Sequence, residues 1–222
     1  MTHILEVDSV NFSIGERKIL SDIYLKCQTG EIVGVFGRNG SGKSSLMKII
    51  FGTLIPQFKV VRIDGKYLKT PYLEPNGISF LTQDDFIPKH LSVRKAIDLF
   101  LAKYQIECFL QDDFIEKIID SKISTLSGGE SKYVHVKLIL SINSKFCLID
   151  EPFSGVSPIM VEHITSLIQK ASTHKGIIIT DHNYRNVLTL STQIYHIKDG
   201  YGKMLNHPTD LIAQGYLKEG ML

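Results

Sequence analysis

Short apolar segments recur along the chain, separated by stretches with the spacing of amphipathic helices. Segments rich in Val, Ile, Leu and Phe predict strands, several of them buried on both faces, at residues 4–10, 31–36, 78–81, 146–149, 176–180 and 194–197. Helical spacing predicts helices at residues 43–51, 93–104, 129–141 and 159–170, with a short final helix at 208–214. This alternation predicts an α/β core with parallel strands, preceded by a more antiparallel region up to about Val61.

The interval from about residue 84 to residue 143 contains helical patterns but no convincing strand. It therefore predicts an all-helical subdomain inserted in the α/β core. No linker rich in Pro, Gly or Ser and no charge block divides the chain, so residues 1–222 are predicted to form one domain.

The composition narrows the class of protein. A hydrophobic content of 43% and a charged content of 22% are typical of a soluble globular protein. A net charge of +2 disfavours nucleic acid as a partner. The three cysteines are widely spaced and suggest neither a disulfide framework nor a metal site, which fits a reducing cytoplasm. Apolar runs far shorter than ~20 residues predict that the chain neither enters nor spans a membrane alone.

Residues 37–44 read GRNGSGKS, between the apolar strand at 32–36 and a predicted helix. This is the strand, loop and helix context of a P-loop, in which backbone N–H groups and a helix N-terminus bind phosphate. Lys43 is positioned to reach β- and γ-phosphates, and the Ser44 hydroxyl suits Mg²⁺. The alternative is a glycine turn with no ligand. The candidate nucleotide ligands are Gly37, Arg38, Asn39, Gly40, Ser41, Gly42, Lys43, Ser44 and Ser45.

A second motif, LSGGE at residues 126–130, is expected by chance in roughly one chain per two thousand. Ser127, Gly128 and Gly129 precede a predicted helix, so free N–H groups and a hydroxyl would form a second anion site. The alternative is an ordinary N-cap followed by a flexible turn.

With these motifs, the chain resembles the ATP-binding cassette (ABC) ATPases along essentially its whole length. The resemblance implies a P-loop NTPase fold with a mostly parallel core sheet, an antiparallel β-subdomain and an inserted all-helical subdomain. The wording from Asp150 and from Gly176 is similar to the ATPases of lipopolysaccharide export and of branched-chain amino-acid import. In this family the signature residues serve the γ-phosphate of the opposite protomer, which implies a head-to-tail dimer.

The resemblance also assigns roles around hydrolysis. Residues 146–151 form an apolar strand ending in two carboxylates, similar to a Walker B motif and its catalytic glutamate. It implies that Asp150 holds Mg²⁺, that Glu151 polarises the attacking water, and that His182 contacts the γ-phosphate. Gln83 matches the Q-loop glutamine, and Ser44, Gln83 and Asp150 become the expected Mg²⁺ ligands. Alone, tandem acids at a strand end are commonplace, and His182 would be read as a loop histidine.

The function implied is that of an ATP-binding and ATP-hydrolysing subunit of a transporter, with ATP and Mg²⁺ as cofactors. The expected partners are a separate transmembrane permease and a second ATPase protomer, forming a homodimer. The expected location is cytoplasmic, on the inner face of the cell membrane, with membrane contact only through the permease. The alternatives are a soluble ABC ATPase of the iron–sulfur assembly type and a scaffold that no longer hydrolyses; Lys43, Asp150, Glu151 and His182 argue against the scaffold.

Three positions depart from the family pattern. Ile14 stands where many relatives stack an aromatic residue on adenine, so weaker stacking is expected. Phe12 is a possible substitute, but a core phenylalanine is the favoured interpretation. Ser157 stands where the D-loop commonly carries Asp, and Tyr133 replaces a frequent Arg, which predicts the loss of a salt bridge common in relatives.

Overall fold

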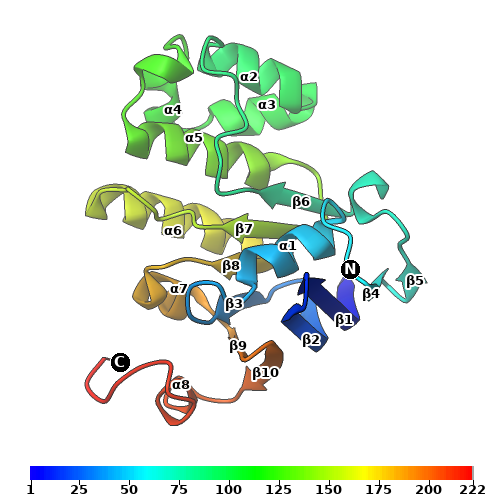
Figure 1. Cartoon of the computed structure of the whole chain (residues 1–222). Helices are drawn as coiled ribbons and strands as arrows, with labels where there is room; N and C mark the ends of the chain where they lie inside the picture. The colour runs from blue at the N-terminus through cyan, green and yellow to red at the C-terminus, as the bar shows by residue number, and fades with distance from the viewer. Residues whose placement is uncertain (222) are drawn as a thin grey trace.

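The computed structural model describes residues 1–221 and contains two sheets (Figure 1). The larger sheet has six strands in the order β10-β9-β3-β8-β7-β6. All neighbouring pairs are parallel except β9 and β10, which confirms the predicted parallel core. The strand bounds are Ile32–Phe36 for β3, Ile78–Leu81 for β6, Phe146–Asp150 for β7, Gly176–Thr180 for β8, Gln193–Lys198 for β9 and Tyr201–Leu205 for β10.

The smaller sheet is antiparallel, as expected for the early part of the chain, and has the order β2-β1-β4-β5. Its strands are β1 Ile4–Ile14, β2 Arg17–Gln28, β4 Phe58–Ile63 and β5 Lys66–Tyr67. Phe12 is only 8% exposed and packs in the apolar core, which confirms the core interpretation. Ile14 ends β1 with 63% of its surface exposed.

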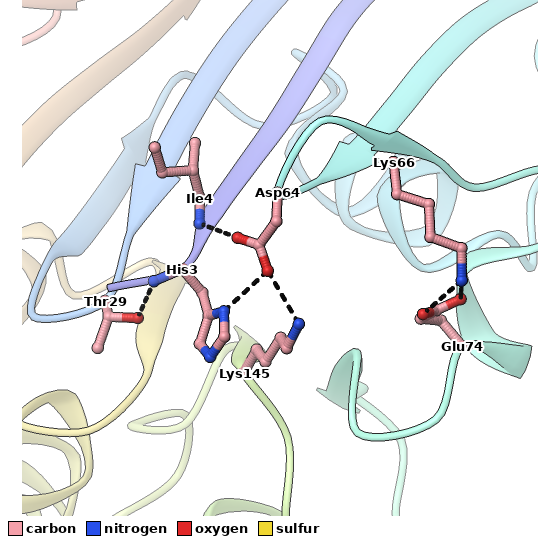
Figure 2. Close-up of polar contacts among 7 residues, drawn as sticks. All are labelled: His3, Ile4, Thr29, Asp64, Lys66, Glu74 and Lys145. Atoms are coloured by element: carbon pink, nitrogen blue, oxygen red, sulfur yellow. Dashed lines mark hydrogen bonds and ion pairs between the residues drawn. The ribbon is translucent and has the colours of Figure 1, made fainter. Parts of the chain in front are cut away.

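A polar cluster joins this sheet to the larger one (Figure 2). Asp64, in the turn between β4 and β5, accepts hydrogen bonds from the Ile4 backbone N–H at 2.9 Å and from Lys145 Nζ at 2.9 Å. His3 Nδ1 lies 2.8 Å from the same carboxylate. Burial alone would raise the pKa of Asp64. The hydrogen bonds from Lys145, Ile4 and His3 outweigh this effect and lower the pKa to about 2. Because Lys145 immediately precedes β7, the cluster fastens the N-terminus to the core.

The segment between β6 and β7 consists of helices, a 3₁₀ turn at Ile123–Thr125 and one isolated bridge from Ser92 to Lys122. This confirms the all-helical subdomain, which lies at the top of Figure 1. Its helices are α2 Val93–Phe100, α3 Lys103–Leu110, α4 Asp113–Ile118 and α5 Gly128–Ser141. The single helix predicted at 93–104 is wrong. The backbone is extended at Leu101 and Ala102, and Gln105 Oε1 accepts from the Ala102 N–H at 2.8 Å to start a second helix.

The Asp112 carboxylate holds this subdomain together. Tyr133 Oη donates to Asp112 Oδ2 at 2.7 Å, and Lys137, one turn later on α5, forms an ion pair with the same oxygen. Burial alone would raise the pKa of Asp112. The hydrogen bonds from Lys137 and Tyr133 outweigh this effect, so the pKa lies below its usual range. Lys137 thus supplies an ion pair one turn after Tyr133 on α5.

The remaining helices belong to the core: α1 Lys43–Phe51, α6 Pro158–Ser172, α7 Tyr184–Leu190 and α8 Asp210–Ala213, with a 3₁₀ turn at Pro71–Leu73. The final helix is shorter than the predicted 208–214. Alternate residues of β8 enter two different apolar clusters, Ile177 and Ile179 on one face of the sheet and Ile178 on the other. Within residues 1–221, no helix has both the length and the apolar character needed to cross a bilayer.

Candidate functional site

The carboxyl ends of β3, β7 and β8 lie side by side, since these strands are parallel neighbours. After β3 the chain turns through residues 37–42 before α1 begins, with Ser44 and Ser45 in its first turn. Gly42 has a φ of 99°, in the left-handed region that favours glycine. A Cβ at Gly37 would lie 2.5 Å from Ser41 Oγ, so the close turn requires glycine there as well. The predicted P-loop is therefore built as a tight loop at a helix N-terminus.

Lys43 folds back onto this loop. Its Nζ donates to the carbonyl oxygens of Gly37 at 2.8 Å and Arg38 at 3.3 Å. Burial lowers the pKa of Lys43, while the nearby Asp150 and Glu151 carboxylates raise it. An ammonium group held by two neutral carbonyls at the base of the loop is placed to bind an anion.

Asp150 ends β7 and is buried beside this ammonium group. Its Oδ1 has no hydrogen-bond partner among the described residues, and neither has Ser41 Oγ. The pKa of Asp150 is raised above its usual value, mainly because the carboxyl group is buried. The Ser44 hydroxyl opposes this rise, and the neighbouring Glu151 carboxylate adds to it. Buried polar atoms rarely lack partners in folded proteins. Two such atoms beside a phosphate-binding loop fit a bound nucleotide and a hard cation.

No group of three or more His, Cys, Asp or Glu residues within residues 1–221 forms a metal cage. Mg²⁺ often takes only one or two protein ligands and completes its octahedron with phosphate oxygens and water. The oxygen donors of Ser44 and Asp150 fit that mode of binding.

The three residues predicted to be catalytic, Gln83, Glu151 and His182, meet at the Glu151 carboxylate. Gln83 Nε2 donates to Glu151 Oε2 at 2.9 Å, and His182 Nε2 lies 2.7 Å from Glu151 Oε1. The Glu151 N–H donates to the Thr180 carbonyl at 2.8 Å, and its φ of 55° is unusual for a residue with a side chain. Loops after three adjacent strands, β6, β7 and β8, therefore meet at one carboxylate.

The signature residues stand apart from this cluster. Ser127 caps α5: its N–H donates to Glu130 Oε2 at 2.8 Å, and its Oγ accepts from the Glu130 N–H at 3.3 Å. Gly128 and Gly129 form the first turn of α5, and within residues 1–221 neither Ser127 side chain nor backbone bonds the P-loop. Ser157 lies exposed ahead of α6. One chain thus carries two separate helix N-termini at its predicted motifs, those of α1 and α5.

A cavity of about 670 Å³ adjoins the P-loop. Its walls come from the start of β2, from the P-loop, from the turn between β9 and β10, and from a segment after α8. Sequence reasoning missed this last wall, formed by Gln214, Gly215 and Tyr216, because no motif marks it. Ile14 is not among the residues that line this cavity.

A phosphate-binding loop at the carboxyl edge of a parallel sheet, with acidic residues ending the neighbouring strand, defines a P-loop nucleotide-binding protein. The family model described as ABC transporter matches residues 20–154. The lipopolysaccharide export system ATP-binding protein LptB of Escherichia coli strain K12 is 31% identical over 219 residues, covering 91% of this chain and 90% of that protein. The chain belongs to the ABC transporter family, as an ATP-binding subunit.

Two further comparisons agree with this assignment. A probable ABC transporter ATP-binding protein of Azorhizobium caulinodans is 33% identical over 215 residues, covering 90% of this chain and 76% of that protein. A solved ATP-binding subunit of an ABC transporter superposes with a TM-score of 0.83 at 21% identity, covering 98% of this chain and 95% of that one. This structural likeness shows the same fold.

Proposed function

We propose that this subunit hydrolyses ATP with Mg²⁺ and that ATP-driven dimerisation powers translocation by a separate transmembrane subunit. The observation that carries the proposal is the convergence of Gln83 and His182 on Glu151, next to Asp150 and the P-loop. A carboxylate so placed can orient a water against a phosphate held by the loop.

The residues divide the work of phosphoryl transfer. Lys43 and the N–H groups of residues 37–45 hold the phosphates, and Glu151 orients the attacking water. His182 contacts the γ-phosphate. Mg²⁺, held by Ser44, Asp150 and Gln83, supplies charge neutralisation on the phosphates when bound.

The opposite face of each nucleotide comes from a second protomer. Ser127 precedes the first turn of α5, and the N–H groups of Gly128 and Gly129 in that turn have no partner within the helix, which suits a γ-phosphate presented by the P-loop of another cassette. Residues 1–222 act as a single ABC ATPase domain, with residues 84–143 as the helical part. A homodimer bound to the permease on the inner face of the membrane follows from this arrangement.

The transport partner is tested by affinity isolation of the tagged protein from gently solubilised native membranes. A polytopic membrane protein recovered in stoichiometric amount supports the proposal and identifies the system. Recovery with soluble partners alone contradicts it and favours the iron–sulfur assembly type of ATPase. Hydrolysis is tested separately on the purified chain, with the Glu151→Gln variant as the inactive control.

A further inference from the structure

The segment formed by residues 214–221, here called the C-terminal brace, crosses from β9 to the P-loop and on to α7. It is drawn in red below α7 in Figure 1. Lys198 Nζ donates to the Gln214 carbonyl at 3.0 Å, and Arg38 Nη2 donates to the Gly215 carbonyl at 3.3 Å. Leu217 is buried in the core. The brace is therefore fastened both to the sheet and to the second residue of the P-loop.

Tyr216 is the centre of the brace. Its ring lies 6.0 Å from that of Phe36, the last residue of β3, in an edge-on arrangement, and 6.5 Å from that of Tyr184. Burial and the nearby Tyr184 raise the pKa of the Tyr216 hydroxyl, and the backbone of Gly37 lowers it. Gly37 is also the residue whose carbonyl oxygen accepts from the Lys43 ammonium. One side chain thus contacts the start of the P-loop and the start of α7.

Tyr184 makes a second contact with the brace, in addition to the contact between its ring and that of Tyr216. Its Oη donates to the Met221 carbonyl at 2.9 Å, and its N–H donates to the His182 carbonyl at 3.0 Å. Because Tyr184 follows His182 by two residues, its position governs that of the histidine.

Helix α7 has only seven residues, Tyr184–Leu190, and no side-chain cap at its N-terminus. A helix of this length has little stability of its own, so its orientation depends on packing. The His182 side chain is exposed, and its one polar contact in residues 1–221 is with Glu151. Besides Glu151, and besides Asp181, which accepts from the Asn183 N–H at 2.8 Å and from the Phe153 N–H at 2.8 Å, the position of the imidazole therefore depends on what α7 packs against.

We propose that the C-terminal brace fixes the His182 loop relative to the P-loop, and that Tyr216 is a positioning residue for His182. The inference rests on the proposed hydrolytic function. A nucleotide bound at the P-loop would meet the histidine at a distance set by Tyr216 and Tyr184. Weakening the Tyr216 and Tyr184 contacts would loosen the group that faces the γ-phosphate, while Lys43 would still donate to the Gly37 and Arg38 carbonyls.

The test uses full-length Tyr216→Phe and Tyr184→Phe variants, which lose one hydroxyl each and keep their rings. Tyr201→Phe is the matched control, since Tyr201 lies on β10 with 64% of its surface exposed. Both brace variants are expected to lower kcat by about three- to tenfold with KM within about twofold of wild type, because positioning rather than binding is lost. The control is expected to retain wild-type kcat.

Two further measurements separate positioning from general stability. In a His182→Ala background, Tyr216→Phe is expected to lower kcat no further; an additive loss would overturn the proposal. Hydrogen exchange of the nucleotide-free Tyr216→Phe variant is expected to accelerate at residues 182–190 and not in α1. Unchanged exchange there, or unchanged kcat in both brace variants, would also overturn it. If the wild-type chain shows no ATPase activity, the proposed function fails while the exchange measurement still decides on the brace.

Discussion

Glu151 shows how much the site demands of one residue. Its backbone is in the left-handed region, which costs about 1–2 kcal/mol for a residue with a Cβ, and its carboxylate is held by both Gln83 and His182. Strained residues of this kind cluster at functional sites, where the surrounding structure holds them in place. A residue fixed at its backbone and at both oxygens is already oriented before any nucleotide arrives.

Replacing Glu151 with Gln is expected to lower kcat by at least about a hundredfold and to leave ATP affinity within about threefold of wild type. The amide keeps the shape of the side chain, while the charge that orients and deprotonates the water is lost. Steady-state hydrolysis and nucleotide-binding fluorescence measure the two effects. Unchanged turnover would remove Glu151 from its assigned role.

Replacing Lys43 with Ala is expected to weaken ATP binding by at least about a hundredfold, since one charge-assisted contact to phosphate contributes about 3 kcal/mol. Lys43 bonds only loop carbonyls in residues 1–221, so the fold does not depend on it. Calorimetric titration with ATP measures the affinity, and circular dichroism confirms folding. A folded variant with wild-type affinity would contradict this role.

Among single residues, the sequence could predict those site residues that belong to a motif. Lys43, Asp150 and Glu151 each follow an apolar strand at fixed spacing, and the structure places them together. Tyr216 could not be found in this way. Its ring packs against Phe36, which precedes the P-loop, across a separation in sequence of well over a hundred residues, and no local pattern encodes such a long-range contact.

Among the elements, the buried strands and amphipathic helices were predictable from the sequence. The edge strand β2 and the break between two helices were not. β2 alternates buried and exposed residues and carries charged side chains such as Arg17, Lys18 and Lys26, so it shows no apolar run. The break between α2 and α3 lacks Pro and Gly, and Gln105 caps the second helix from inside, where no Ser or Thr signals a start. These features depend on side-chain contacts that spacing alone does not encode.

The ion pair between Asp112, which caps α4, and Lys137 on α5 can be tested by substitution. Replacing Lys137 with Met is expected to lower the free energy of unfolding by about 3 kcal/mol, because Asp112 is left buried without its cation. Urea denaturation measures the change. Lys103→Met, at an exposed position of α3, is the control and is expected to change stability by less than about 0.5 kcal/mol. Equal effects of the two substitutions would show that the ion pair contributes nothing.

The Asp64 cluster predicts a dependence of stability on pH. The pKa of Asp64 is about 2 in the folded chain against a usual 3.8, so its stabilising contribution is present above about pH 4 and is lost as the pH falls toward 2. The Tm advantage of wild type over Asp64→Asn is expected to shrink as the pH falls below about 4. Scanning calorimetry across this range tests it, with Asp98→Asn as an exposed control. A margin independent of pH would contradict the role of the cluster.

For the whole molecule, the decisive feature is the separation of the P-loop on the core from Ser127 on the helical subdomain. The two helix N-termini belong to different parts of the fold. In the proposed dimer, two copies come together around the nucleotide, so ligand occupancy and oligomeric state are coupled.

The Glu151→Gln variant is expected to double its molar mass when ATP and Mg²⁺ are added, because bound nucleotide that is not hydrolysed holds the dimer together. Light scattering coupled to gel filtration measures the mass. The Lys43→Ala chain serves as the control and is expected to stay monomeric under the same conditions. A Glu151→Gln chain that remains monomeric with saturating ATP would contradict head-to-tail pairing.

The same separation has a genetic consequence. In the proposed dimer, a chain substituted only at Lys43 and a chain substituted only at Ser127 are each expected to be inactive alone. A mixed pair would contain one composite site with both parts intact. Co-expression of the two defective copies is therefore expected to restore activity, up to about a quarter of the wild-type sites if pairing is random. Two defects in the P-loop, such as Lys43→Ala and Ser44→Ala, give no such rescue, so complementation would divide mutations by the half-site to which they belong.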